Sequence, residues 1–147
     1  MFIEYGFGLK EVPLAFDKLV DIPFGLTQEQ LIQLLGKPDK IIDDEEILPE
    51  PTYYYNELMT NFQFDPEEDN RLDEIDTSHP EVRLWNEKVI GKTSSEIKQL
   101  LYLHDIDSFE YEDYETMTYI NNEAIAFGFE FDKVVEIVFW ICYENDG

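Results

Sequence analysis

The chain has 147 residues, of which 34 are Asp or Glu and 10 are Lys or Arg, giving a formal net charge of -24. Its 44% hydrophobic and 15% aromatic content excludes an intrinsically disordered protein, because disordered chains are poor in these residues. The negative charge makes direct binding to nucleic acid or to an anionic membrane unfavourable, and it favours a basic protein partner. A length of this order suits a single domain.

The N-terminal stretch and the single cysteine indicate a soluble cytoplasmic protein. The first residues, MFIEYGFGLKEVPLAF, lack the basic region and the clean apolar stretch of a secretion signal. No apolar run approaches the length of a membrane span. The one cysteine, Cys142, lies in an apolar run, where a thiol acts as a small hydrophobe in a reduced compartment.

The first clear pattern is a helix that follows an N-terminal segment, residues 1–23. We expect that segment to supply an edge strand or a short helix. The stretch FGLTQEQLIQLLGKPDK, residues 24–40, predicts a helix with a capping box, in which the Thr27 hydroxyl accepts from the third helical N–H and Gln30 reaches back. Gly36, followed by a proline, ends this helix.

An acidic connection and a predicted β-meander follow the first helix. The connection carries a run of acids without a base: Asp43, Asp44, Glu45 and Glu46. The stretches YYYNELMTNFQFD (residues 53–65) and RLDEI (residues 71–75) read as strands, with turns at Asn-Glu and after Phe-Asp. The three consecutive tyrosines cannot all point inward from a strand, so at least one of them faces outward.

The stretch DPEEDNRLDEID, residues 65–76, superficially resembles a calcium-binding EF-hand loop. It has Asn70 where that loop needs a glycine, and it ends in Asp76 rather than glutamate. It also lies between predicted strands instead of helices. The pattern therefore predicts a hairpin loop, and we expect no metal site.

A connector, residues 81–89, reads as a strand or an extended arm, and a second helix follows in IGKTSSEIKQLLYLHDI, residues 90–106. This helix repeats the first without a gap: Thr93 falls on Thr27, and Glu96 completes a second capping box. Downstream, TYINNEAIAFGFEFD and VVEI match YYYNELMTNFQFD and RLDEI in the same order.

These matches predict a duplicated unit, with one copy in residues 24–80 and another in residues 90–143. Each copy reads as a helix, an acidic loop and three strands, and is too small to bury its own apolar face. Two copies would share one layer. The predicted fold is therefore α+β, with the helices packed on one face of a shared antiparallel sheet, although two unrelated helix-plus-meander segments would give a similar pattern.

A second acidic run follows the second helix and interleaves aromatic residues with its acids. The candidate partner-binding residues in this run are Asp105, Asp107, Glu110, Tyr111, Glu112, Asp113, Tyr114 and Glu115. Since both acidic runs follow a repeated helix, we expect them to occupy equivalent places and to lie on one side of the molecule. They suit either a solvated face or a docking surface for a basic partner, with tyrosines as anchors.

No pattern in the sequence indicates catalysis, a cofactor or a metal. The two histidines, His79 and His104, have no cysteine or histidine pairing typical of zinc, and neither a nucleophile nor an oxyanion site accompanies them. Trp85, Trp140 and the phenylalanines of FGFEF are expected to be core residues. We therefore expect a protein that is not an enzyme.

The capped helix GLTQEQLIQLLGKPD, followed by an acidic connection and a β-meander and then repeated once, resembles the tandem-repeat architecture of β-lactamase inhibitor proteins. It is also similar to small outer-membrane assembly lipoproteins with a related unit, although this chain lacks a lipobox cysteine and cysteine pairs. A very acidic α+β chain of this size also resembles the immunity proteins of bacterial toxin systems. That resemblance implies stoichiometric neutralisation of a cognate toxin, often a basic nuclease.

The sequence thus favours a non-catalytic binding protein whose acidic runs cap a basic partner, most plainly a toxin domain. Carboxylates would pair with the lysines and arginines that a nuclease uses for phosphate. Two alternatives stay open: an acidic scaffold module without a selective partner, and a hydrolase or small-ligand protein with a pocket between helices and sheet. The oligomeric state is not predicted by any pattern.

Overall fold

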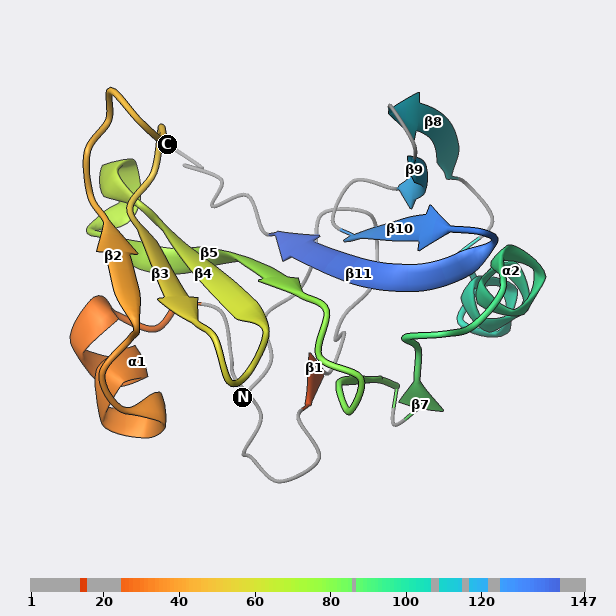
Figure 1. The fold of residues 1–147 in the computed structure, drawn as a ribbon, viewed down its shortest axis with the longest axis horizontal. Coiled ribbons are helices and arrows are strands. Elements are labelled where there is room, and N and C mark those ends of the chain that lie inside the picture. The colour runs from red at the N-terminus through yellow and green to blue at the C-terminus, as the bar shows by residue number, and fades with distance from the viewer. Residues whose placement is uncertain are drawn as a thin grey trace.

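Two helices and two antiparallel sheets make up the described part of the chain (Figure 1). The computed structural model describes residues 14–15, 25–85, 87–106, 109–114, 117–121 and 125–140, with the backbone alone for 14–15, 111–114 and 117–121. The helices are α1 (Gln28–Leu35) and α2 (Ser94–Leu103). Neither is long and apolar enough to cross a lipid bilayer, and no other described helix is.

The larger sheet has eight strands in the order β2-β3-β4-β5-β11-β10-β9-β8. They are β2 (Lys40–Ile42), β3 (Thr52–Tyr55), β4 (Thr60–Asp65), β5 (Arg71–Thr77), β8 (Glu110–Tyr114), β9 (Met117–Asn121), β10 (Ile125–Glu130) and β11 (Lys133–Trp140). A smaller sheet, β1-β6-β7, joins β1 (Leu14–Ala15), β6 (Arg83–Leu84) and β7 (Glu87–Lys88). The α+β class is confirmed, as are strands in the N-terminal segment and the connector.

Both predicted capping boxes are present, and they define where the helices begin. The Gln30 N–H donates to the Thr27 hydroxyl at 3.1 Å, and the Thr27 N–H donates to the Gln30 side chain at 2.9 Å. The second helix repeats this exchange between Thr93 and Glu96, at 3.2 and 3.0 Å. Helix α1 ends as predicted at Gly36, whose φ of 87° lies in the left-handed region that favours glycine.

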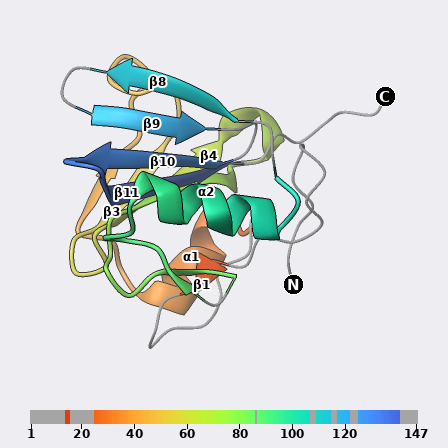
Figure 2. The ribbon, with the colours of Figure 1, turned by 90° about the vertical axis from the view of Figure 1, so that its right-hand side faces the viewer.

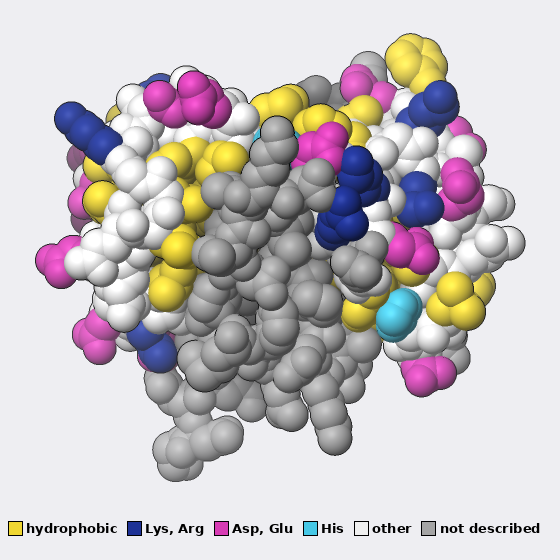
Figure 3. Space-filling model, turned by 90° about the horizontal axis from the view of Figure 1, so that it is seen from below, with side chains coloured by type: hydrophobic (Ala, Val, Ile, Leu, Met, Phe, Trp, Pro, Cys, Tyr) yellow, Lys and Arg dark blue, Asp and Glu magenta, His cyan; other side chains and the backbone are white. Residues whose placement is uncertain are grey.

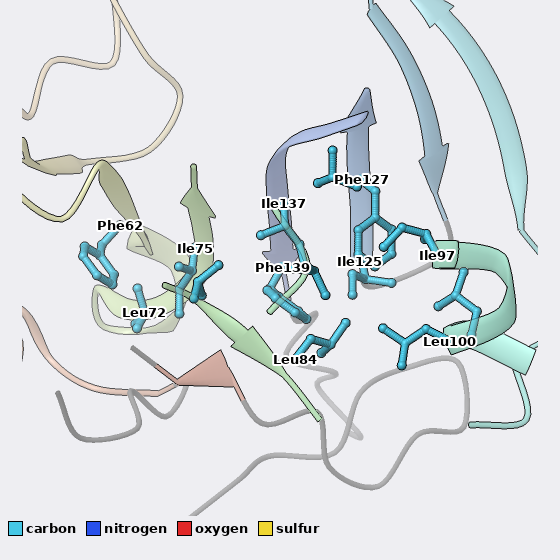
Figure 4. Packing of buried hydrophobic residues seen from close by; sticks show 14 of the residues in the cluster. Phe62, Leu72, Ile75, Leu84, Ile97, Leu100, Ile125, Phe127, Ile137 and Phe139 are labelled. Carbon is cyan, nitrogen blue, oxygen red and sulfur yellow. The ribbon is translucent and has the colours of Figure 1, made fainter. Parts of the chain in front are cut away.

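One hydrophobic core lies between the large sheet and the two helices, both of which lie on the same side of the sheet (Figures 1 and 2). Strand β4 shows why: its residues alternate between buried and half-buried, so one face turns Phe62 and Phe64 inward. Figure 4 shows the core running from Phe62 past Leu84 to Leu100 of α2. Full burial of each such side chain stabilises the fold by about 1.5–3 kcal/mol.

The two halves of the large sheet share unusual backbone details. Strand pair β4–β5 has a β-bulge after Gln63, and β10–β11 has one after Gly128. The bulges lie in β5 and β11, whose extra residues are Asp73 and Val135. Each is left without an opposite partner, because Phe64 pairs with Leu72 and Phe129 pairs with Val134.

The segment before each helix pairs with the large sheet in the same way in both halves. The Gly25 N–H donates to the Leu72 carbonyl at 3.0 Å, and the Gly91 N–H donates to the Val134 carbonyl at 2.9 Å. Both glycines have φ near 90°, at 90° and 94°. The entry into each helix is therefore built by the same local geometry.

The prediction of three strands after each helix is wrong, because each helix is followed by four strands of the large sheet. The additional strands are β2 and β8, and both occupy outer positions in the sheet. Of these, β8 falls inside the second acidic run, which we expected to be a loop. It combines acids with tyrosines in an edge strand, which pairs with β9 and with no other strand in the part of the chain that the structure describes.

Two aromatic residues do not lie in the core where the sequence placed them. Phe131 is 99% exposed at the turn between β10 and β11, where its φ of 50° belongs to the turn itself. Trp140 is half-buried on the opposite face of the sheet from Phe139. Of the three consecutive tyrosines, Tyr53 and Tyr55 are buried and Tyr54 faces outward, as predicted. Cys142 lies outside the described residues.

Candidate functional site

The first predicted acidic run forms an exposed loop between β2 and β3. Asp43, Asp44, Glu45 and Glu46 are all exposed. Within the loop, the Asp44 carboxylate accepts from the Glu46 N–H at 3.0 Å and its carbonyl accepts from two further N–H groups. Asp44 therefore shapes the turn, and its neighbours extend into solvent.

The second predicted acidic run begins at the end of α2 and continues into β8. Asp105 is exposed, with a φ of 61°, and it follows the C-cap residue His104. Glu110 is exposed at the start of β8. The other members of the run are described only as backbone or not at all: Tyr111, Glu112, Asp113 and Tyr114 lie in the strand, and Asp107 and Glu115 lie outside the described residues.

The expectation that the two acidic runs lie on one side of the molecule is wrong, although they hold corresponding places in the two halves of the sheet. Strands β2 and β8 are the two outermost strands of the eight-stranded sheet. This separation follows from the pairing of β5 with β11 at the centre, which moves the first strand of each half to an opposite edge. One small partner surface therefore does not receive both runs side by side.

The helix-bearing side of the molecule carries both signs of charge. Seen from below, it shows basic and acidic side chains among apolar ones (Figure 3). Two ion pairs involve the connector, residues 81–89. Lys88 pairs with Glu81 at 2.6 Å within the connector, and Lys92, in the turn before α2, pairs with Glu87 at 3.8 Å. Exposed pairs of this kind contribute little stability, so their importance here is the mixed charge of the surface.

The opposite face of the sheet carries a row of acids at its centre, which the sequence analysis missed. We call Glu74 and Asp76 of β5 with Glu136 of β11 the central acidic row. Burial, the neighbouring Glu136 and Glu74 charges and a hydrogen bond to Glu136 raise the pKa of Asp76 to about 7. Burial and the Glu50 charge raise the pKa of Glu74 to about 6.

A second group of acids adjoins this row where β4 ends and β5 begins. The carboxylate cluster consists of Glu50, Asp65 and Asp73, each offering one oxygen within 4.8 Å of the other two. Burial, a hydrogen bond to Glu50 and the charges of Glu50, Asp65 and Glu74 raise the pKa of Asp73 to about 8. Burial also raises the pKa of Glu50, against the effect of its hydrogen bond with Asp73.

These acids come together because β5 is a central strand that contains a bulge. Leu72, Ile75 and Thr77 face the core, so the residues between them turn to the opposite face. The extra residue at the bulge is Asp73, which places two successive acids on that face. The alternation of apolar and acidic residues can be seen in the stretch RLDEIDT. The central place of β5 in the sheet, however, depends on its pairing with β11.

The cluster can hold a proton or a cation, and the other candidate groups have structural roles. The His79 ring accepts from the Glu81 N–H at 3.0 Å, and the His104 ring stacks on Trp85 with centroids 3.8 Å apart. The Tyr55 hydroxyl donates to the Gly36 carbonyl at 2.8 Å, and burial raises its pKa to about 12. None of these geometries supplies an activated nucleophile.

Residues 65–76 form a hairpin between β4 and β5 and do not have the geometry of an EF-hand loop. Asp65 ends β4, a single 3-10 turn follows (η1, Pro66–Glu68), and Asp76 lies inside β5. The hairpin loop predicted from the missing glycine is confirmed.

The sequence matches no known protein family and no curated protein. A solved structure, described as an extracellular protein containing an SCP domain from Bacillus anthracis str. Ames, is similar in fold, with a TM-score of 0.51 and 11% sequence identity. The match covers 80% of this chain and 43% of that chain. At this identity the likeness concerns the fold alone.

Proposed function

We propose that this chain is a non-catalytic binding protein that docks a basic protein partner along the edge strand β8. The observation that carries the proposal is the composition and place of this strand: its five residues are three acids, Glu110, Glu112 and Asp113, and two tyrosines, and it is the last strand of the sheet. Within the described residues, β8 pairs with β9 and with no other strand. Its other edge is the kind to which an extended segment can add.

The mechanism combines backbone pairing with charge. A partner segment added beside β8 would take up the unpaired N–H and C=O groups of that edge, which gives affinity independent of sequence. Residue positions alternate along the strand, so Glu110 and Glu112 share one face and Asp113 lies on the other. Lysines and arginines of the partner would meet acids on both faces. Such pairing speeds association and weakens in salt.

The proposed partner class is a basic toxin domain, and the activity is its stoichiometric neutralisation. This class rests on the resemblance to immunity proteins and on the formal net charge of -24, which suits a surface evolved to bind lysines and arginines. The cytoplasm, which the single cysteine favours, would be the compartment where the partner is met. If the chain were only a solubility module, or a protein that binds a small ligand in a pocket, the capture of a protein partner would not depend on the acids of β8.

We also propose that the two halves arose by duplication of one helix-plus-meander unit. The supporting observations are the two capping boxes, the two bulges and the paired hydrogen bonds of Gly25 with Leu72 and of Gly91 with Val134. Packing alone does not require all of these to recur at matching positions. Duplication places the first strand of each unit at an edge; the edge strand of the second unit, β8, has three acids, and that of the first unit, β2, has none.

The test compares two sets of charge-neutral variants in affinity capture from the source cells. The first removes three acids from β8 (Glu110→Gln, Glu112→Gln and Asp113→Asn). The matched control removes three acids at the other edge (Asp43→Asn, Glu45→Gln and Glu46→Gln), where all three are exposed and Asp44 keeps its turn.

We expect one basic protein to be captured in about equimolar amount by the wild type and by the control, and to be lost with the β8 set. Equal loss with both sets would mean that total charge, not β8, attracts the partner. Capture of only a broad mixture of abundant basic proteins would favour the solubility module. Either result would refute the proposal.

A further inference from the structure

We propose that the exposed end of α2 holds an apolar side chain of the same basic segment that pairs with β8. The site consists of Tyr102 and Leu103, the last two residues of α2, together with Phe109 just before β8, and we call it the apolar end of α2. This inference rests on the proposed function, because it takes the segment docked at β8 and identifies what the next residues of that segment contact.

Two large apolar side chains at this end are open to solvent. Tyr102 is 54% exposed and Leu103 is 77% exposed, although Leu100 and Leu101 just before them are buried. The Tyr102 ring lies against the ring of Phe109, with their centroids 5.9 Å apart. Single exposed apolar residues are common on protein surfaces, whereas neighbouring ones that form a patch indicate a contact surface.

The fold itself does not need these two residues. Helix α1 has eight residues and stops at Gly36, whereas α2 has ten. Counted from the two N-caps, Gly36 falls on Tyr102, so Tyr102 and Leu103 are the extension of α2. Eight residues are enough to pack a helix on this sheet, as α1 shows with its fully buried Leu31. The extension is present only in the half of the sheet that carries β8.

The apolar end of α2 is continuous with β8. Phe109, whose ring contacts Tyr102, is followed directly by Glu110, where β8 begins. Helix α2 and β8 lie at the same end of the molecule, the one that faces the viewer in Figure 2. An extended segment advances about 3.3 Å per residue. A segment that pairs with β8 and continues past Glu110 would therefore reach Phe109 and then the end of α2.

The charges around this surface favour a basic segment. Asp105 and Glu110, the acids that follow α2 and Phe109, are exposed, and the chain has no Lys or Arg from residue 99 to residue 132. The C-terminal end of a helix also carries a partial negative charge, and no basic residue lies in the last turn of α2. A second copy of this chain, with its formal net charge of -24, would be repelled.

The occupant that fits is thus an extended segment in which arginines or lysines are followed by an apolar residue. Its cations would meet the acids of β8 and Asp105, and its apolar side chain would cover Leu103. The two contacts should respond differently to salt. Pairs between exposed charges are screened at high ionic strength, whereas the burial of apolar surface does not depend on screening.

The probes are two synthetic peptides of equal length and charge. Both have a core in which arginines alternate with valines, and each end carries either leucines or serines, so that either strand orientation is tested. Their affinities for the full-length protein are measured by fluorescence anisotropy at low and at high salt. The test variants are Leu103→Ser and, separately, Tyr102→Ser. The matched control is Ile47→Ser, which removes a side chain 64% exposed in the loop after β2.

We expect the leucine-ended peptide to bind the wild type and Ile47→Ser at least about fivefold more tightly than the serine-ended peptide, because covering Leu103 removes apolar area from water. This ratio should persist at high salt, and it should fall below about twofold in Leu103→Ser and in Tyr102→Ser. Both side chains are exposed, so both variants should fold as the wild type does, which circular dichroism checks. A ratio that neither variant lowers, or that Ile47→Ser lowers equally, would overturn the inference.

The β8 set of variants separates this inference from the proposed function. Glu110→Gln, Glu112→Gln and Asp113→Asn together should weaken the binding of both peptides by similar factors, because both peptides have the same charge. If the β8 set does so but the ratio survives in Leu103→Ser and Tyr102→Ser, docking at β8 stands and the apolar end of α2 has no part in it. If the β8 set changes neither affinity, or neither peptide binds, the proposed function fails and this inference fails with it.

Discussion

Replacing Asp76 with asparagine should stabilise the protein at neutral and alkaline pH. Asp76 lies in the central acidic row, where burial and the charges of Glu136 and Glu74 raise its pKa from 3.8 to about 7. The folded chain therefore keeps a proton that the unfolded chain loses between these two values, and folding stability falls as pH rises through this range. Asparagine carries no charge and can still donate a hydrogen bond to Glu136.

The size of the stability difference between Asp76→Asn and the wild type follows from the one proton that the folded wild type keeps on Asp76. A difference of one bound proton changes the free energy of unfolding by about 1.36 kcal/mol per pH unit. Between pH 5 and pH 7 the gap between Asp76→Asn and wild type should widen by at most about 2.7 kcal/mol, and partial exposure to solvent reduces this to about 1–2 kcal/mol. Above about pH 8 the gap should stay constant, because Asp76 is then ionised in both the folded and the unfolded chain.

The assay is urea unfolding followed by tryptophan fluorescence at half-unit steps from pH 5 to 8.5, with EDTA present to exclude metal effects. Glu57→Gln is the control, since Glu57 is exposed in the turn between β3 and β4 and lies outside the acidic row. The Asp76→Asn difference at each pH is compared with the difference that this control gives. If the Asp76→Asn difference is constant across this range, Asp76 titrates like a surface acid and the reasoning about the row fails.

Three further changes test the fold, each measured by urea unfolding. Phe62→Ala should destabilise the protein by roughly 3–5 kcal/mol because Phe62 is fully buried, whereas Phe131→Ala, at a side chain 99% exposed, should change stability by less than about 0.5 kcal/mol. Thr93→Ala should cost about 1 kcal/mol through loss of the helix cap, and Ser95→Ala, one residue inside α2, should not. Gly91→Ala should cost about 1 kcal/mol from backbone strain alone, because its φ is 94° and no atom lies within 4 Å of an added Cβ; no loss would refute that backbone conformation.

The sequence by itself determined the features that depend on neighbours along the chain. The caps at Thr27 and Thr93 join residues three apart, so their side-chain pattern suffices to place the helix starts. That at least one of the three tyrosines faces outward follows from strand alternation in the same way, and the structure shows that it is Tyr54. The stop at Gly36 is also local, since it needs only a residue that tolerates a positive φ.

The tertiary structure alone decided which acids meet. Nothing local says that β5 pairs with β11, and that pairing sends the two predicted acidic runs to opposite edges while it brings Glu136 beside Asp76. The β8 acids read as a loop because alternating Glu and Asp have low strand propensity, and pairing with β9 overrides it. With 34 acids in the chain, adjacency in sequence cannot single out a desolvated cluster. Desolvation depends on which strands become neighbours, and long-range pairing decides that.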